Sequence, residues 1–309
     1  MRILVTGGAG FIGSHVVDAL IGAGHEVAIV DSFWSHGGGR RDNVNPKAQL
    51  FEVDIRDAAL ADVFTKFRPQ VVSHHAAQHS VAISTQEPLY DADVNVKGLL
   101  NVLTQAAQQQ VRKVVFASSA ATYGTPQRLP IDEQHPQLPE SPYGITKMIA
   151  EYYLRYFAGG PGLRYTALRY GNVYGPRQDP NGEAGVIAIF SGRILKGEQI
   201  RVDWDGEQQK DYVFVGDVAR ANLLAVESGD NEIINIGTGI GTSVNALHKS
   251  IAVAAGRDVE VVKAPKRPGD VYRCVFAIEK AKTALGWEPR TQLAEGIAKT
   301  VAHFRANPA

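Results

Sequence analysis

Cysteine is nearly absent from this sequence, since Cys274 is the only one among 309 residues. A single thiol excludes an internal disulfide framework and is typical of the reducing cytoplasm, where we expect the protein to reside. Long apolar runs are also absent, and the apolar run at the N-terminus soon breaks into glycine. The sequence therefore predicts neither a signal peptide nor a membrane span.

An excess of charge is missing as well. Lys and Arg number 32, Asp and Glu number 32, and the formal net charge is zero. We therefore expect neither nucleic acid nor a membrane surface as a partner, because both are recognised through an excess of positive charge. The length suffices for one large domain or for two unequal ones.

The sequence does contain a glycine-rich turn inside a strand–helix–strand pattern at its start. An apolar strand (residues 1–6) leads into the turn (7–13), a helix continues to about residue 23, and a second strand (26–30) ends at Asp31. This order is typical of a dinucleotide-binding unit. Glycines that only tighten an ordinary βαβ turn are the alternative, but the acid that closes the second strand favours a bound cofactor.

The turn has the residues that a pyrophosphate requires. Gly7 and Gly10 carry no side chain that would hold the backbone amides away from the phosphates. Phe11 and Ile12 open the helix, whose first N–H groups are unpaired and attract an anion. We therefore expect these four residues to contact the cofactor.

Asp31 indicates which dinucleotide is bound. Its carboxylate can accept hydrogen bonds from both hydroxyls of an adenosine ribose and would repel a 2′-phosphate, so it favours NAD over NADP. Arg40 and Arg41 in the next loop leave NADP open, because a basic loop can hold that phosphate.

Strands and helices continue to alternate up to residue 175. Strands are expected at residues 50–53, 71–74, 114–118 and 165–170, and helices at 60–67, 89–109 and 143–158. We predict an α/β fold with a Rossmann-type, doubly wound, mostly parallel sheet. The carboxyl ends of its strands should meet at one edge, where the cofactor channel is lined by Asp54, Ile55, Ala76, Ala77 and Ser118.

Beyond residue 175 this alternation stops, and shorter segments with more Gly, Pro and Asp follow. The shift in composition predicts two parts. Residues 1–175 form the NAD-binding domain, to which later segments return, and residues 176–309 form mainly a smaller C-terminal α/β domain that binds the substrate.

A tyrosine and a lysine four residues apart provide a candidate general base. Tyr143 and Lys147 leave the same face of the expected helix. Lowering the tyrosine pKa from about 10 by about three units requires roughly 4 kcal/mol, and an ammonium about 4 Å away supplies that much at a partly shielded site. Such a base can take the proton of an alcohol while hydride leaves the carbon, and Ser119 can hydrogen-bond the same hydroxyl. A half-buried tyrosine beside a solvated lysine is the alternative.

Several motifs together carry a family resemblance. They are residues 6–13, 118–119, 143–147, 169–177, 235–239 and 267–270. In this order they resemble the extended short-chain dehydrogenases, and most of all the nucleotide-sugar 4-epimerases, over essentially the whole chain. The resemblance implies that Tyr143 takes the proton of the sugar 4-hydroxyl while hydride passes from C4 to NAD, after which the 4-keto sugar turns and takes the hydride back.

The residues after Ser119 favour this subgroup. The related 4,6-dehydratases and the UDP-glucuronate decarboxylase carry Asp or Glu after the corresponding Ser or Thr, whereas this chain has Ala120 and Ala121. No carboxylate is available there for an elimination. We therefore expect 4-epimerisation of UDP-hexoses such as UDP-glucose and UDP-galactose.

The resemblance also implies further contacts. On the cofactor side these are His79, Asn95 and Tyr170, and on the substrate side Asn172, Gly185, Val186, Val202, Lys210, Arg267 and Asp270. Three positions depart from the family pattern: His79 replaces a usual Lys, Lys210 replaces a usual Arg, and Asp203-Trp204 replaces Phe-Gly. The last two changes leave open a nucleotide other than UDP, because lysine lacks the bidentate fork of arginine.

Cys274 matches the position that limits the size of the hexose pocket in the family. A tyrosine there excludes N-acetyl sugars, so the small cysteine implies that UDP-N-acetylglucosamine and UDP-N-acetylgalactosamine are also accepted. A cysteine buried in the core is the alternative and would say nothing about the substrate.

The cluster of His74, His75 and His79 suggests metal ligands at first sight. No cysteine lies nearby and the cofactor should pass there, so we expect hydrogen-bonded histidines and no metal.

Two other functions are compatible with the motifs. A UDP-glucuronate 4-epimerase would require a cation near the sugar C6, and no unassigned cation is evident. A non-catalytic NAD-sensing protein would not need Ser119, Tyr143 and Lys147. The resemblance further implies a homodimer through residues 89–109 and the helix of Tyr143, although packing on the sheet also accounts for their apolar stripes.

Overall fold

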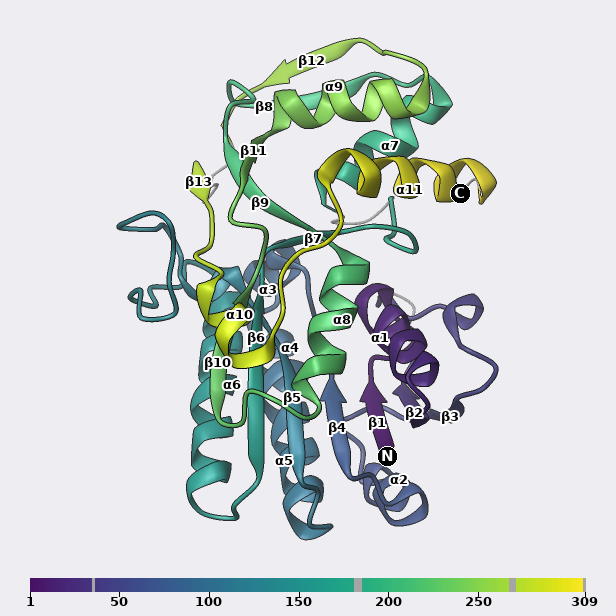
Figure 1. Cartoon of the computed structure of the whole chain (residues 1–309), viewed down its shortest axis with the longest axis vertical. Helices are drawn as coiled ribbons and strands as arrows, with labels where there is room; N and C mark the ends of the chain where they lie inside the picture. Colours follow the sequence, from purple (N-terminus) through teal and green to yellow (C-terminus); the bar gives the residue numbers. More distant parts are fainter. Residues whose placement is uncertain (35–36, 181–184, 267–270, 308–309) are drawn as a thin grey trace.

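The main body of the protein is a seven-stranded parallel sheet (Figure 1). The computed structural model describes residues 1–34, 37–180, 185–266 and 271–307. In spatial order the strands are β10 (Glu232–Ile236), β6 (Arg164–Tyr170), β5 (Lys113–Ser119), β4 (Val71–His74), β1 (Arg2–Thr6), β2 (Glu26–Asp31) and β3 (Gln49–Glu52). The strand order runs outward in both directions from β1 and β4, so a crevice opens at their carboxyl ends. The predicted α/β fold is confirmed.

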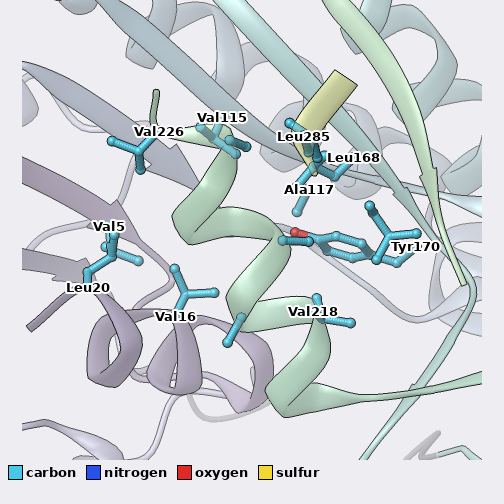
Figure 2. Packing of buried hydrophobic residues seen from close by; sticks show 14 of the residues in the cluster. Val5, Val16, Leu20, Val115, Ala117, Leu168, Tyr170, Val218, Val226 and Leu285 are labelled. Carbon is cyan, nitrogen blue, oxygen red and sulfur yellow. The ribbon is translucent and has the colours of Figure 1, made fainter. Parts of the chain in front are cut away.

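Helices cover both faces of this sheet because its central strands are apolar on both sides. Ile3 and Val5 face one side, which is covered by α1 (Phe11–Gly22), α8 (Val215–Ala225) and α10 (Glu279–Leu285). Leu4 faces the other side, which is covered by α2 (Leu60–Phe67), α5 (Leu99–Gln108) and α6 (Pro142–Gly159). Figure 2 shows the first of these cores, where Val218 of α8 lies near Val16 of α1.

The long helix expected over residues 89–109 is interrupted. It consists of α4 (Pro88–Ala92), a π-helical segment (Asp93–Gly98) and α5, and it is preceded by an unexpected short helix, α3 (Val81–Gln86). Ser80 begins α3 by accepting a hydrogen bond from the N–H of Ile83 at 2.9 Å. In the π-helical segment Asn95 bonds to the backbone of Gln78, a tertiary contact that hydrophobic periodicity does not reveal.

A smaller lobe lies beyond the carboxyl edge of the large sheet, at the top of Figure 1. Its four-stranded sheet contains β7 (Asn172–Tyr174), β9 (Gln209–Phe214), β11 (Gly241–Ser243) and β13 (Arg273–Cys274), and a second pair is β8 (Ile200–Asp203) with β12 (Val261–Ala264). Three helices cover these strands: α7 (Val186–Lys196), α9 (Val244–Ala255) and α11 (Leu293–Ala306). Between its passages through this lobe the chain returns to the large sheet through α8, β10 and α10.

The short single-turn segments are 3₁₀ helices at Arg41–Asn43 and Ala120–Thr122. Within the part of the chain that the structure describes, no helix has the length and apolar character needed to cross a bilayer.

Candidate active site

A cavity of about 600 Å³ opens at the carboxyl edge of the large sheet. The strands and α6 bring fourteen of the fifteen predicted cofactor residues to its wall: Gly7, Gly10, Phe11, Ile12, Asp31, Asp54, Ile55, Ala76, Ala77, His79, Ser118, Tyr143, Lys147 and Tyr170. They come from six strand ends and two helices that are far apart in the sequence. Their convergence follows from the parallel order of the strands.

The glycine-rich turn fits a pyrophosphate closely. Gly7 has φ +67°, and a Cβ atom there would lie 2.6 Å from the backbone nitrogen of Ala76. Gly10 precedes α1 without a side-chain cap, so the first N–H groups of this helix, at the cavity wall, keep no capping acceptor. Backbone donors at a helix start, on a turn that excludes side chains, are suited to the phosphates of a dinucleotide.

Asp31 lies at the adenosine end of the cavity. Its carboxylate accepts from the N–H groups of Ala9 at 3.0 Å and Phe33 at 3.1 Å, and burial raises its pKa. Arg40 pairs with Asp179 and Arg41 with Glu52, each at 2.9 Å. Because both guanidinium groups already have carboxylate partners, the loop favours an unphosphorylated ribose, as in NAD, over NADP.

Tyr143 and Lys147 line the cavity, and Ser119 lies beside Tyr143 at the end of β5 without lining the cavity itself. Ser141 caps α6 by accepting from the N–H of Gly144 at 3.1 Å, which places Tyr143 in the first turn of the helix. The phenol of Tyr143 hydrogen-bonds with Ser119, while the ammonium of Lys147 donates to the carbonyl of Ala117 at 2.9 Å.

The expected lowering of the tyrosine pKa is wrong for the protein alone. Burial, with a smaller contribution from the charge of Asp91, raises the pKa of Tyr143 to about 12, and the hydrogen bond of Ser119 only partly opposes this. The ammonium of Lys147 lies over the face of the tyrosine ring, 5.7 Å from its centre. Burial lowers the pKa of Lys147 to about 8, which leaves it mainly protonated at neutral pH.

Asn95 is the predicted cofactor residue that does not line the cavity. It is buried behind the wall, where its side-chain oxygen accepts from the N–H of Gln78 at 2.8 Å and its amide donates to the carbonyl of Gln78 at 2.9 Å. Asn95 therefore holds the loop that carries His79, and it acts on the cavity through that loop.

The histidines are placed as hydrogen-bonded groups. His74 bonds through Nδ1 to the hydroxyl of Thr6 at 2.7 Å, and His75 bonds through Nε2 to that of Ser73 at 2.9 Å. Burial lowers the pKa of both to about 3, so both are neutral. His79 is exposed on the cavity wall. Across the described ranges no group of three His, Cys, Asp or Glu residues is arranged to hold a metal ion.

Apart from Ser119 and Tyr143, the predicted substrate residues that the structure describes lie in the smaller lobe, and none of them lines the cavity. Asn172 begins β7, and Lys210 and Cys274 are register partners on β9 and β13. Gly185 and Val186 begin α7. Val202 is buried in the apolar core of this lobe, so it supports β8 and presents no surface to a ligand. Arg267 and Asp270 lie outside the described residues.

A buried polar network that the sequence did not reveal supports the strand ends. Arg169 makes a bidentate pair with Glu151 at 2.8 and 2.6 Å, and Ser118 donates to the same carboxylate at 2.7 Å. Ser118 therefore lines the cavity while its hydroxyl is engaged behind the wall. Tyr170, whose ring points toward α8 in Figure 2, bonds to Asn222.

A comparison with protein families identifies the family to which the chain belongs. The model described as the NAD dependent epimerase/dehydratase family matches residues 3–237. The chain belongs to this family. Together with the UDP-sugar 4-epimerases that are similar to this chain, the match confirms the resemblance to nucleotide-sugar epimerases.

Solved structures of other epimerases are similar along the whole chain. A UDP-glucose 4-epimerase from Thermotoga maritima, solved with UDP-glucose, is 50% identical with a TM-score of 0.97 and full coverage of both chains. One from Thermus thermophilus, solved with NAD, is 46% identical with a TM-score of 0.94, and the match covers 99% of this chain and 100% of that one. A UDP-N-acetylglucosamine 4-epimerase from Methanobrevibacter ruminantium is 36% identical with a TM-score of 0.93, covering 99% and 98%.

Proposed function

We propose that the protein is an NAD-dependent 4-epimerase that interconverts UDP-glucose and UDP-galactose. The observation that carries this proposal is the placement of Tyr143 and Lys147, with Ser119 bonded to the phenol of Tyr143, in a cavity lined by the residues predicted to contact NAD. The full-length similarity to a UDP-glucose 4-epimerase solved with UDP-glucose supports the choice of substrate.

Each residue of the triad has a task in this reaction. Tyr143 takes the proton of the sugar 4-hydroxyl, and Ser119, already bonded to its phenol, orders that hydroxyl. Lys147 supplies a buried positive charge that favours the phenolate. Gly7, Gly10 and Asp31 would hold NAD, which would supply the redox chemistry as acceptor and donor of the C4 hydride, and its positive charge would add to that of Lys147.

The same region argues against an elimination. Ala120 and Ala121 follow Ser119, so no carboxylate is provided there. The carboxylate of Glu151 points into the buried network and is paired with Arg169 at 2.6 Å. A dehydratase requires an acid beside the sugar, whereas an epimerase only has to return the hydride.

We propose the same division of the chain between the two ligands that the composition predicts. We assign residues 1–175, with the segments that return to the large sheet, to NAD, and residues 176–309 mainly to the UDP-sugar. We assign three residues to the nucleotide: Lys210, Arg267 and Asp270. We assign three others to the sugar and uracil sides of the pocket: Asn172, Gly185 and Val186. Cys274 is assigned to the hexose pocket, where its small size admits N-acetylated sugars.

Exposed apolar residues support a homodimer through α4 and α6. Leu89 is 88% exposed, Tyr156 69% and Tyr152 57%, and Ile145 lies on the same helix as the two tyrosines. Large apolar side chains gathered on neighbouring helices are typical of an interface. Tyr156→Glu should convert a dimer to a monomer in light scattering, whereas Val253→Glu on α9 should not. A wild-type monomer would contradict the proposal.

The cytoplasmic location remains a prediction from the single cysteine.

The function is tested by proton NMR of the purified protein with UDP-galactose, and then with UDP-N-acetylgalactosamine, without added cofactor. Appearance of UDP-glucose is expected, because NAD is regenerated in each cycle and stays bound. No conversion, even after NAD is added, would overturn the proposal. The departures at Lys210 and Trp204 would then point to a different nucleotide sugar.

A further inference from the structure

Asp91, on α4, is a fully buried carboxylate in contact with three separate segments. Its Oδ1 accepts from the side-chain amides of Gln78 at 2.8 Å and Asn95 at 3.0 Å. Its Oδ2 accepts from the hydroxyl of Thr146 at 2.8 Å. All three donors are neutral, so the negative charge is held by hydrogen bonds alone. Among the described residues no cation is within ion-pair distance of it.

The three donors connect Asp91 to the site from different directions. Gln78 belongs to the cavity wall and precedes His79. Asn95 lies in the π-helical segment and holds the backbone of Gln78. Thr146 is on α6, next to Lys147, and its hydroxyl also lies 3.0 Å from the carbonyl of Tyr143.

We propose that Asp91 is a positioning residue for the proposed epimerisation: its carboxylate fastens the wall loop at Gln78 and the π-helical segment to the catalytic helix at Thr146. This fixes Tyr143 and Lys147 relative to the wall against which cofactor and sugar lie. The inference rests on the proposed function, because it assigns Asp91 a task within that reaction.

The charge of Asp91 acts on the triad as well. The other titratable groups packed near α6 are neutral or paired: His74 and His75 are neutral, and Glu151 is paired with Arg169. Tyr170 bonds to Asn222 on α8. The charge of Asp91 adds to the burial that raises the pKa of Tyr143, and it partly opposes the burial that lowers the pKa of Lys147. It therefore keeps the lysine protonated and opposes ionisation of the tyrosine.

Two variants separate position from charge. In Asp91→Asn the remaining oxygen can accept from Gln78 and Asn95, and the new amide can donate to the hydroxyl of Thr146, so the connections are kept and the charge is lost. Asp91→Ala leaves three buried donors without an acceptor.

For Asp91→Ala we expect kcat to fall about 10- to 100-fold with little change in KM, because the reacting groups are displaced. For Asp91→Asn we expect a kcat plateau close to wild type. The acid limb of its pH profile should move to lower pH by about half a unit or more, since the charge that opposes the phenolate is gone.

Asp217→Asn on α8 is the matched control. Asp217 is also buried, and it accepts from the N–H groups of Arg290 at 3.1 Å and Thr291 at 2.9 Å, but it does not line the cavity. This variant should lose stability and keep the wild-type pH profile.

The outcomes are distinguishable from failure of the proposed function. Wild-type protein that does not convert UDP-galactose overturns the epimerase, and with it the task assigned to Asp91. An active wild type with an unshifted Asp91→Asn profile and an Asp91→Ala kcat near wild type overturns only the positioning role. If Asp91→Ala does not fold, the Asp91→Asn profile alone decides: a shift supports the proposal and no shift overturns it.

Discussion

The large sheet and the smaller lobe differ in the parts of the chain that are assigned to their ligands. In the large sheet the cavity wall consists mainly of backbone turns at strand ends, held from behind by buried polar groups such as Glu151 and Arg169. In the smaller lobe several of the assigned residues are side chains on short strands, among them the exposed Asn172 and the half-buried Lys210. A backbone cradle suits a cofactor that stays bound, and side chains on short strands suit a sugar that has to turn between the two hydride transfers.

The most severe test of this division is Tyr143→Phe, which removes the base but leaves the cradle intact. Turnover should fall about 10²- to 10⁴-fold, because proton transfer from the 4-hydroxyl loses its acceptor. The NAD released on denaturation should equal that of wild type. Tyr152→Phe, on the exposed side of the same helix, is the control. Turnover near wild type would remove the assigned mechanism.

Gly7→Ala tests the cradle itself. The new methyl would lie 2.6 Å from the backbone nitrogen of Ala76, so the unfolding free energy should fall by about 1–3 kcal/mol and NAD content should decrease. Gly24→Ala has a similar positive φ, +83°, with no atom within 4 Å of the added carbon, and isolates the backbone strain. Equal losses of NAD in both variants would contradict a closely fitted turn.

The two histidines at the carboxyl end of β4, His74 and His75, should make stability depend on pH. Burial lowers the pKa of His74 and His75 to about 3, below the usual 6.5, so between these values the unfolded state binds more protons. The unfolding free energy should therefore fall as pH decreases from about 6.5 toward 3, measured by urea denaturation. His75→Gln should reduce this dependence more than His248→Gln in the smaller lobe. If the stability of both variants depended equally on pH, the assignment of this pH dependence to the histidines at the end of β4 would be refuted.

Cys274→Tyr should produce the smallest change and only in the smaller lobe. Cys274 packs with Tyr123, Ile131 and Phe276, and burial raises its pKa to about 11, so it is an inert thiol. A tyrosine should lower the ratio of N-acetylated to plain UDP-hexose turnover by about tenfold. Cys274→Ser should keep the ratio. An unchanged ratio in the tyrosine variant would mean that Cys274 is only a core residue.

The large sheet could be predicted because local patterns determine it. Strand ends in a parallel sheet converge, so Asp31, Ala76 and Ser118 could be placed at one edge from their order in the chain alone. Asn95 is predicted to contact the cofactor, but it lies behind the cavity wall. Its contacts with Gln78 arise from a π-helical segment that periodicity does not show.

Buried charges could not be predicted from the spacing of motifs. The four-residue spacing of Tyr143 and Lys147 predicts a lowered tyrosine pKa, but burial at the cavity wall raises that pKa. Asp91 belongs to no predicted motif, and the motif that contains Arg169 does not reveal its pairing with Glu151, since the partners of both residues lie on other elements. In the smaller lobe, strands of two to six residues from distant parts of the chain pair, so the core position of Val202 depended on tertiary packing.

The central claim is that the hydride removed from C4 returns to the same carbon within one protein molecule. UDP-galactose deuterated at C4, incubated with purified protein without added cofactor, tests it directly by NMR. The mechanism predicts UDP-glucose that retains deuterium at C4. Deuterium lost to water, or a product changed at another carbon, would contradict it.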